Sequence, residues 1–328
     1  MTVEPGTRTM TADAKAIATA VRCLSAGGLV AFPTETVYGL GADAGNGEAV
    51  ARLYAAKGRP VFNPLITHVA DLDAALQLAI LDVDAGKLAN EYWPGPLTLV
   101  LSKRPDCGVA DLALAGLDSI ALRVPAHPVA RELLRAFGKP IVAPSANRSG
   151  HISPTSAAHV MADLRGRIDL IIDAGACAVG VESTIVSCLG GPPSLLRPGG
   201  LTRENIERTL GRALTEPAHD PQSDGEAPLA PGMLASHYAP KAALRLDADA
   251  ARSGEALLAF GAAPDGKGKT LNLSPRGDLI EAAANLFSHL RALDAAGVKS
   301  IAVMKVPREG LGEAINDRLT RAAAPRTA

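Results

Sequence analysis

The feature that most constrains this fold is the alternation of short apolar runs with amphipathic stretches along the chain. Apolar runs of strand length occur at residues 29–32, 97–101, 119–124, 141–143, 170–173 and 184–186. Helical spacing of apolar positions occurs between them, at residues 14–24, 50–56, 72–78, 128–137 and 157–164. Mixed alternation of this kind predicts an α/β layer fold, in which helices cover a sheet. Several strand orders remain compatible with it.

A second, smaller unit follows a change in character. Residues 215–229 are rich in proline, charge and small polar side chains and have no periodic apolar face, which predicts a linker. Beyond it, strand-like runs at 244–246, 256–260 and 301–306 alternate with helix-like stretches at 279–293 and 311–323. The 328 residues also fit two domains at roughly 150 residues each. The expected division is 1–212, a linker at 213–240, and a small α/β domain at 241–328.

Composition narrows the class of protein. The net charge of −1 excludes the global basic field that non-specific nucleic-acid binding needs, so any anion site must be local. The cysteines form no CxxC pair and no zinc spacing, and the N-terminus shows no secretory pattern, which favours buried, reduced thiols in the cytosol. Apolar runs fall short of the roughly 18 residues that a transmembrane helix requires. A soluble, cytoplasmic protein is expected.

Two neighbouring runs look like parts of a binding site. The run PTETVYGLG at residues 33–41 places hydroxyls and a carboxylate after an apolar strand, and its glycines would let a ligand approach the backbone. The run KGRPVFNPL at residues 57–65 supplies Lys57 and Arg59. A guanidinium fork beside an ammonium suits a polyanion such as a triphosphate. Either run alone is equally compatible with a surface turn.

Two other nucleotide motifs are set aside. The segment 261–270 approaches a phosphate-binding P-loop, but neither register places its glycines and its Ser or Thr correctly, and residues 271–273 look extended where a helix is needed. The segment 39–44 matches a degenerate GxGxxA dinucleotide pattern, but polar residues 34–36 interrupt the strand that should lead into it.

Polar turns recur after other apolar strands. PSANRSGHISPT follows the strand at 141–143, and ESTIV at 182–186 leads to LRPGG at 196–200. Hydroxyls and amides from such turns can bind phosphate and ribose, a capped helix at Ser153 can present backbone amides to an anion, and Arg197 adds a cation. Any one of these segments reads more readily as a helix cap or an Asx turn. Together they predict one shared cleft.

As an ordered set, these motifs resemble one family. PTETVYGLG, KGRP-x-x-NPL, PSAN-x-SG-x-x-SPT and EST-IV with a downstream LRPG occur in the order found in threonylcarbamoyl-AMP synthases, the YrdC-like family. The PGM and HYAP segments within residues 231–240 and AINDRL at 314–319 resemble its long, two-domain form. The resemblance implies an α/β fold with a YrdC-like twisted open mixed sheet, plus a smaller C-terminal Rossmann-like α/β domain.

The implied activity is that of a nucleotidyltransferase. L-Threonine, bicarbonate or CO2, and ATP would yield threonylcarbamoyl-AMP and pyrophosphate, with Mg²⁺ bridging phosphate oxygens. The product would pass to a transferase that makes threonylcarbamoyladenosine on tRNA, without stable tRNA binding by this chain and without a membrane partner. Residues 213–240 would act as a lid over the bound nucleotide, with Met233, His237 and Tyr238 as the covering side chains.

The site residues follow by motif position. L-Threonine would lie near Thr36, His68, Arg123, Ala143 through its backbone, and Ser183, with Arg123 as the bidentate partner of the α-carboxylate. ATP would lie against Lys57, Arg59, Asn63, Ser119, Ser145, Asn147, Ser153, Arg197 and Tyr238. The cations Lys57, Arg59 and Arg197 are the catalytic candidates, and the resemblance implies no metal ligand from the protein.

Two other functions remain open at this point. A YrdC-type domain could instead be a non-catalytic RNA- or nucleotide-binding module, which the net charge of −1 disfavours. A YrdC-like domain also occurs in hydrogenase maturation factors that transfer a carbamoyl group to a thiol. That alternative calls for further segments with CxxC pairs, and the sequence has none.

Overall fold

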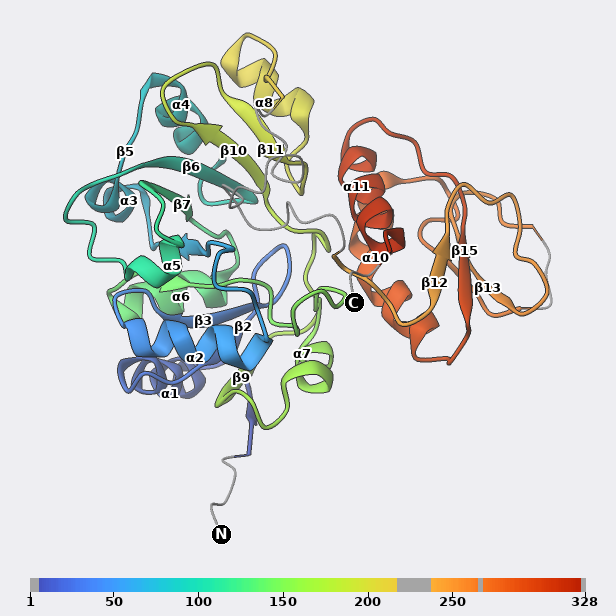
Figure 1. Ribbon diagram of the computed structural model, residues 1–328, viewed down its shortest axis with the longest axis horizontal. Helices are drawn as coiled ribbons and strands as arrows, with labels where there is room; N and C mark the ends of the chain where they lie inside the picture. The colour runs from blue at the N-terminus through green and yellow to red at the C-terminus, as the bar shows by residue number, and fades with distance from the viewer. Residues whose placement is uncertain (1–5, 217–236, 265–267, 326–328) are drawn as a thin grey trace.

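The structure is a computed structural model that describes residues 6–216, 237–264 and 268–325. It contains a large body built on an eleven-stranded sheet and a small body built on a four-stranded sheet. Figure 1 shows the two bodies side by side, with α10 and α11 of the small body facing the large one. The predicted α/β class is therefore confirmed.

The large sheet is mixed, as the resemblance implies. Its strands run in the spatial order β1 (Arg8–Thr11), β9 (Leu170–Asp173), β2 (Val30–Phe32), β3 (Gly39–Asp43), β8 (Ile141–Val142), β4 (Ile66–His68), β7 (Ser119–Arg123), β6 (Leu97–Lys103), β10 (Thr184–Cys188) and β11 (Ser194–Arg197), with β5 (Ala79–Ile80) paired to β6. The β4–β7 and β6–β10 pairs are parallel, whereas the β6–β7 and β10–β11 pairs are antiparallel.

Helices cover both faces of this sheet. They are α1 (Ala14–Ser25), α2 (Gly47–Lys57), α3 (Leu72–Leu78), α4 (Val83–Tyr92), α5 (Asp111–Leu114), α6 (Pro128–Phe137), α7 (Ala157–Leu164) and α8 (Arg203–Leu210). Strand β2 shows the consequence of period-2 alternation, because Val30 and Phe32 join the apolar cluster under α1 and α6 while Ala31 joins the main core on the other side. Both faces are thus buried.

One feature of the 33–41 run differs from the prediction. Residues 39–43 form strand β3 and not a loop, so the dinucleotide pattern at 39–44 is not a strand-to-helix turn. A side chain at Gly41 would meet Phe32 at 2.9 Å and Ile141 at 3.0 Å. The prediction that Gly41 lets a ligand approach the backbone is wrong, because this glycine serves close packing inside the sheet.

The small body is a parallel sheet in the order β12 (Ala243–Arg245), β15 (Ser300–Val303), β13 (Glu255–Ala259) and β14 (Thr270–Asn272), with α10 (Leu279–Asp294) and α11 (Leu311–Ala323). Strand β14 lies where a P-loop would need a helix, which confirms that the motif at 261–270 is not a P-loop.

The two bodies share an apolar cluster. Val37, Ile152 and Val181 of the large body pack with Leu286 and Phe287 of α10, among others. Ion pairs cross the same boundary: Arg203–Glu313 at 2.7 Å, Arg291–Asp163 at 2.8 Å and Arg318–Glu182 at 2.8 Å. Helices α10 and α11 are therefore held against the large body by both apolar and charged contacts.

The predicted linker and lid fall largely on residues outside the described ranges, namely 217–236 with Met233. The chain pairs with the large sheet as far as Thr215, which bridges to Ser194. No helix within the described ranges is long and apolar enough to cross a membrane. The cysteines are free, and Cys23 is partly exposed where burial was predicted.

Candidate active site

A small inner cavity lies on the face of the large sheet that turns toward residues 237–238. It has a volume of about 50 Å³ and is lined by Thr34, Val37, Gly39, Arg59, Ile66, His68, Arg123, Ala143, Pro144, Ser145, Glu182, Ser183, Arg197, His237 and Tyr238. Such a volume holds a few water molecules, since one water needs roughly 10–15 Å³ by this kind of measure. Binding of a nucleotide at this cavity therefore requires some of the lining groups to move.

Strand register explains why residues from distant segments meet here. His68 of β4 pairs with Arg123 of β7. Arg197 at the end of β11 pairs with Ile185 just inside β10, so Glu182 and Ser183, which precede β10, lie beside it. Of the predicted site residues, the lining includes Arg59, His68, Arg123, Ala143, Ser145, Ser183, Arg197 and Tyr238. The prediction that the polar turns share one cleft is confirmed for these residues.

The cations give the cavity a positive character. Arg59 donates to the backbone carbonyls of Asn63 and Pro64, at 3.2 and 3.0 Å. Among the described residues, no carboxylate lies within ion-pair distance of Arg59 or of Lys57. Burial lowers the pKa of Arg59 to about 10, and it lowers the pKa of Lys57 well below its usual value, with a further contribution from Arg59. Burial without a carboxylate partner thus disfavours the charged forms of both groups, and an anionic ligand beside them would stabilise those charged forms.

Lys57 is placed by its helix. Asn46 caps the start of α2, and Gly58, with φ of 60°, ends it directly after Lys57. The ammonium donates to the backbone carbonyls of Ser145 and Asn147, each at 2.5 Å. Lys57 therefore lies beneath the loop that carries two other candidate ATP ligands, and not in the cavity lining.

Arg197 connects the cations to the hydroxyl groups. Its Nη2 atom donates to the carbonyl of Ser183 at 2.8 Å. The Ser183 hydroxyl in turn lies 2.7 Å from that of Thr98. Gly199, two residues beyond, packs directly on this backbone, because a Cβ there would overlap the carbonyl group of Glu182. The close approach of LRPGG to EST thus fixes where Arg197 points.

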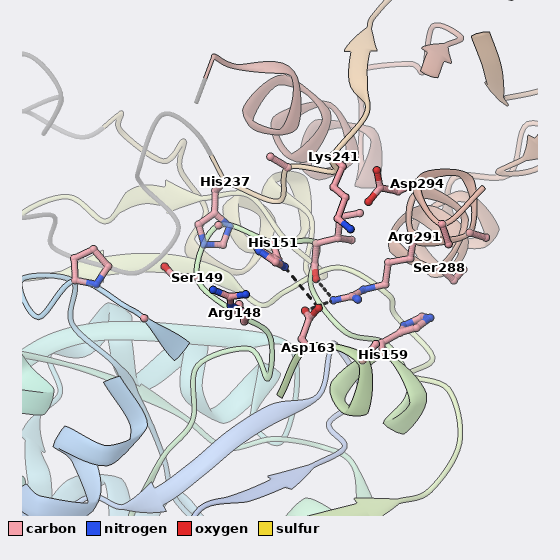
Figure 2. Close-up of a pocket in the computed structure, with 18 residues that line it drawn as sticks. Arg148, Ser149, His151, His159, Asp163, His237, Lys241, Ser288, Arg291 and Asp294 are labelled. Atoms are coloured by element: carbon pink, nitrogen blue, oxygen red, sulfur yellow. Dashed lines mark hydrogen bonds and ion pairs between the residues drawn. The ribbon is translucent and has the colours of Figure 1, made fainter. Parts of the chain in front are cut away.

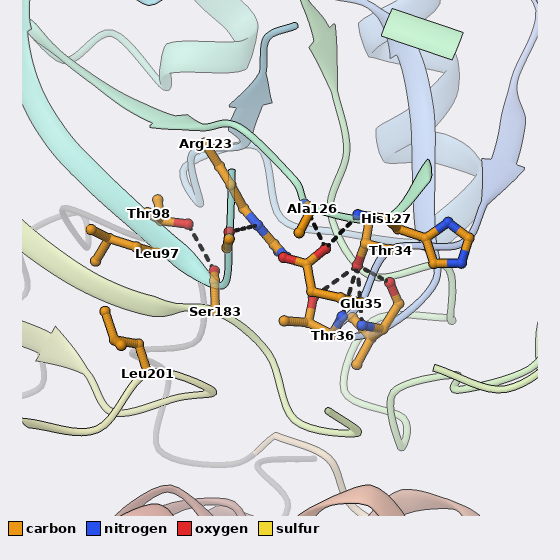
Figure 3. A network of polar contacts seen from close by, with 12 residues as sticks. Thr34, Glu35, Thr36, Leu97, Thr98, Arg123, Ala126, His127, Ser183 and Leu201 are labelled. Atoms are coloured by element: carbon orange, nitrogen blue, oxygen red, sulfur yellow. Dashed lines mark hydrogen bonds and ion pairs between the residues drawn. The ribbon is translucent and has the colours of Figure 1, made fainter. Parts of the chain in front are cut away.

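Arg123 already has a carboxylate partner. Figure 3 shows its guanidinium against Glu35, with Nη2 donating to Oε1 at 2.6 Å. The other carboxylate oxygen of Glu35 accepts from the backbone amides of Ala126 and His127. Burial alone would raise the pKa of Glu35, but Arg123 brings it below its usual value. A substrate carboxylate at Arg123 would therefore share the guanidinium with Glu35, which the sequence prediction had not included.

His68 is neutral in this environment. Burial, together with the charge of Arg123, lowers its pKa to about 3, and its Nδ1 atom lies 3.3 Å from the carbonyl of Ile66. A neutral imidazole can donate or accept a hydrogen bond but carries no charge at neutral pH. The site therefore offers His68 as a polar contact and not as a cation.

The remaining predicted residues lie outside the cavity lining. Thr36 bonds to Thr34, which does line it (Figure 3). Ser153 donates to Glu182 at 2.5 Å. Asn147 donates to the carbonyls of Arg148 and His151. Ser119 is the least expected, because it begins β7 while Arg123 ends it, about 13 Å away at roughly 3.3 Å per residue.

Several buried polar side-chain atoms have no hydrogen-bond partner within the part of the chain that the structure describes. They include Asn63 Oδ1, Thr67 Oγ1, Asn147 Oδ1, His237 Nδ1 and Arg318 Nη2. Buried polar groups in folded proteins are nearly always paired, so unpaired ones call for an explanation. Of these residues, His237 lines the inner cavity, while Asn63 and Asn147 contact Arg59 and Lys57 through their backbone carbonyls. A polar ligand bound beside these cations could supply the missing partners.

Glu182 is a site residue that the sequence reasoning left without a role, although it stands in the EST motif. It lines the cavity and pairs with Arg318 of the small body. Thr34 and Pro144 were also missed as lining residues, despite their place in quoted motifs. These three residues lie in loops next to strands, so the tertiary arrangement of those loops decides that they face the cavity, and no local signal separates them from their neighbours.

A larger groove opens between the two bodies beside the inner cavity. It has a volume of about 1170 Å³, and His237 lines both. Figure 2 shows Arg148 and Asp163 from the large body facing Lys241, Arg291 and Asp294 from the small one. We call it the outer groove; its mixed charges contrast with the cationic inner cavity.

The described residues contain no cluster of three or more His, Cys, Asp or Glu side chains able to hold a metal ion. Glu182 and Glu35, the carboxylates next to the cavity, are each paired with an arginine. A divalent cation here would therefore depend on oxygen ligands from a substrate and water.

Known proteins resemble this chain along most of its length. The family model described as telomere recombination, which covers the Sua5, YciO and YrdC proteins, matches residues 22–199. The model described as the C-terminal domain of threonylcarbamoyl-AMP synthase matches residues 201–324. The threonylcarbamoyl-AMP synthase of Bacillus subtilis is 41% identical and that of Pyrococcus abyssi 43% identical; the matches cover 94% and 92% of this chain and 93% and 92% of those proteins.

Solved structures agree. The crystal structure of P. abyssi Sua5 complexed with L-threonine has a TM-score of 0.89 at 39% identity, and it covers 97% of this chain and 98% of that one. Escherichia coli YciO, at 23% identity and a TM-score of 0.54, matches 59% of this chain and shows the shared fold alone. This chain belongs to the threonylcarbamoyl-AMP synthase family, in the form that carries the C-terminal domain.

Proposed function

We propose that this chain is an L-threonylcarbamoyladenylate synthase, a nucleotidyltransferase that converts L-threonine, bicarbonate or CO2, and ATP into threonylcarbamoyl-AMP and pyrophosphate. The observation that carries the proposal is the inner cavity, in which Arg59, Arg197 and Arg123 meet hydroxyl groups from four separate motifs. Its family membership supports the same reaction.

We assign the two sides of the cavity to the two larger substrates, L-threonine and ATP. L-Threonine would lie at the half formed by Thr36, His68, Arg123, Ala143 and Ser183. ATP would lie at the side of Arg59, Ser145, Arg197 and Tyr238, which line the cavity, and would extend toward Lys57, Asn63, Asn147 and Ser153 outside the lining, with Ser119 as a more distant candidate. The unpaired oxygens of Asn63 and Asn147 support the second assignment, since ribose hydroxyls could donate to them.

The chemistry depends mainly on positioning. The threonine amine and bicarbonate form a carbamate with loss of water, and a carbamate oxygen then attacks the α-phosphorus of ATP. The new P–O bond forms as the bond to the β-phosphate oxygen breaks, and pyrophosphate leaves with that electron pair. Arg59, Arg197 and Lys57 would offset the charge that develops on the leaving group, in a site that excludes water.

A magnesium ion would arrive with the nucleotide. The paired carboxylates leave phosphate oxygens and water as its ligands, which is the usual way that Mg²⁺ binds beside ATP. When bound, it would neutralise phosphate charge. The protein's own contribution remains the three cations and the hydroxyl groups around them.

The wider assignments rest on the same proposal. We assign residues 1–212 to the catalytic domain, 213–240 to a lid and 241–328 to the small domain; His237 and Tyr238, at the described end of the lid, line the cavity and support its place over the nucleotide. The labile product would pass to a tRNA threonylcarbamoyl transferase in the cytoplasm, without a stable complex between this chain and tRNA.

The test is pyrophosphate release from ATP and Mg²⁺, with and without bicarbonate, using L-threonine, L-serine, L-valine or no amino acid. We expect release to require bicarbonate and L-threonine, with serine a better substitute than valine because a site that bonds a hydroxyl rejects an analogue without it. ATP binding without release in any mixture would instead favour the non-catalytic binding module.

The matching variant is Arg59→Ala. We expect it to lose about 10²-fold or more in pyrophosphate release, in the range seen when one charge-stabilising donor is removed. Lys139→Ala, which removes an exposed cation that is not part of the cavity lining, serves as the control. Wild-type turnover by Arg59→Ala would remove Arg59 from the site.

A further inference from the structure

The small body contributes a buried arginine to the edge of the candidate active site. Arg318 lies on α11 and has no exposed surface. Its Nε atom donates to Glu182 Oε2 at 2.8 Å, across the boundary between the bodies. Its Nη1 atom bonds to Asp317, and Nη2 has no partner among the described residues.

The contact continues into the cavity through Glu182. The other carboxylate oxygen of Glu182 accepts the Ser153 hydroxyl at 2.5 Å. Burial alone would raise the pKa of Glu182, but Arg318, Arg197 and the Ser153 hydrogen bond bring it below its usual value. Glu182 therefore stays charged and holds Ser153, a candidate ATP ligand, because Arg318 supplies the matching charge.

A second contact runs through Tyr238. The guanidinium carbon of Arg318 lies 5.2 Å from the centroid of the Tyr238 ring, within the range of a cation–π interaction. The same ring stacks on Phe287 of α10, with centroids 5.6 Å apart. Tyr238 has a φ of 61°, a conformation that costs a non-glycine residue roughly 1 kcal/mol or more and needs support from its surroundings. Arg318 and Phe287 supply that support.

From these contacts we propose that Arg318 is a positioning residue for the nucleotide half of the site. Through Glu182 it orients Ser153, and through its contact with the ring it orients Tyr238. The small body is then a working part of the active site and not only an attached domain. This inference rests on the proposed function, because it assigns Ser153 and Tyr238 to ATP.

The loss of Arg318 has a predictable consequence. A buried Glu182 without its cation would turn to the next cation that acts on it, Arg197. Arg197 would then be drawn away from the phosphates. In the threonine half, Arg123, the partner of the α-carboxylate, pairs with Glu35 and has no contact with Arg318, so this anchor should be unaffected. Ser183, which accepts from Arg197, is the member of that half that a shift of Arg197 would reach.

The experiment compares Arg318→Met with Arg203→Met in the full chain. Arg203 provides the control, because it also forms an ion pair between the two bodies, with Glu313 of α11 at 2.7 Å, but its partner does not line the cavity whereas Glu182 does. We would measure binding of Mg²⁺–ATP without bicarbonate, binding of L-threonine, and the KM values for both during pyrophosphate release.

We expect Arg318→Met to weaken ATP binding and raise the KM for ATP at least tenfold, while L-threonine binding stays within twofold of wild type. Arg203→Met should leave both unchanged, and Arg318→Lys should recover part of the ATP affinity. Wild-type ATP affinity in Arg318→Met would overturn the proposal. So would an equal loss in both methionine variants, because it would reduce Arg318 to a docking contact.

Two further measurements keep the test open to refutation. If Arg318→Met does not fold, Glu182→Gln/Arg318→Met removes both charges of this ion pair at once. ATP affinity should still be lost, and wild-type affinity in this double variant would overturn the proposal. If wild-type protein binds ATP but releases no pyrophosphate, the proposed synthase reaction fails, while the comparison of ATP affinities still decides the role of Arg318.

Discussion

Replacing Glu35 with alanine removes the carboxylate that neutralises Arg123. The two side chains are 13% and 4% exposed, and their ion pair is 2.6 Å long. Breaking a buried ion pair from one side costs about 3–5 kcal/mol, because the remaining charge stays buried. We expect Glu35→Ala to lower the free energy of unfolding by about that amount, a large share of the roughly 5–15 kcal/mol typical of folded proteins.

Urea unfolding followed by tryptophan fluorescence can measure this loss. The protein has one tryptophan, Trp93. It lies in the segment before β6, and Gly95, two residues on, accepts a hydrogen bond from Arg123. Asp118→Ala, which removes a fully exposed partner of Lys103, is the control and should not shift the midpoint measurably.

L-Threonine should partly rescue the variant. Its α-carboxylate can take the position at Arg123 that Glu35 leaves, so saturating L-threonine should stabilise Glu35→Ala more than wild type. Ligand at 100 times its dissociation constant adds about 2.7 kcal/mol. Two results would refute this explanation. One is a free energy of unfolding for Glu35→Ala within about 1 kcal/mol of the wild-type value, which is the upper range for exposed ion pairs. The other is a larger stabilisation of wild type than of Glu35→Ala by L-threonine.

Three further predictions concern other residues. His68 has a pKa of about 3 in the folded protein and 6.5 in the unfolded chain, so below pH 6.5 the unfolded chain binds a proton that the folded protein does not. The free energy of unfolding should therefore fall as the pH drops below 6.5, by about 2 kcal/mol at pH 5. Urea titrations of His68→Gln should show a smaller loss, and an identical pH profile would contradict this. Gly180→Ala should loosen the contact of α10 with the large body, because Gly180 has a φ of 80° and a Cβ there would overlap the carbonyl of Ala283. The control is Gly175→Ala, since Gly175 has a φ of 83° but nothing within 4 Å of its Cβ position. Limited proteolysis should separate the two bodies faster in Gly180→Ala than in Gly175→Ala, and equal rates would refute this. Asp13→Ala should destabilise the protein by about 1 kcal/mol through loss of the α1 cap, measured as a urea midpoint shift, and no shift would contradict the capping role.

Local patterns determined much of the fold. The apolar periodicities place α1, α3, α6, α7 and several strands within a few residues of their observed bounds. They do not predict short strands such as β1 and β5, which depend on pairing partners, and they miss β3, whose glycines look like loop residues. Hydrophobic spacing predicts a helix or strand whose own residues alternate between buried and exposed positions. A short edge strand or a glycine-rich strand lacks that pattern and forms because it pairs with a neighbouring strand.

The candidate site divides in the same way. The ordered motifs supply its chemical groups and its family, because residue types and short spacings lie within one segment of chain. The partners of those groups come from tertiary structure: Arg123 meets Glu35 across 88 residues, and Arg318 meets Glu182 across 136. Such pairs depend on strand order and on the docking of α11.

The sequence by itself thus determined the α/β class, the two-unit organisation, the cationic and hydroxyl-bearing motifs and the family. Tertiary structure alone decided that Lys57 lies beneath the 145–147 loop, that Ser119 lies far from Arg123, and that a carboxylate already pairs with Arg123. The physical reason is the distance along the chain over which each effect acts. Propensity and periodicity act over a few residues, while burial and charge pairing depend on which distant segments the fold brings into contact.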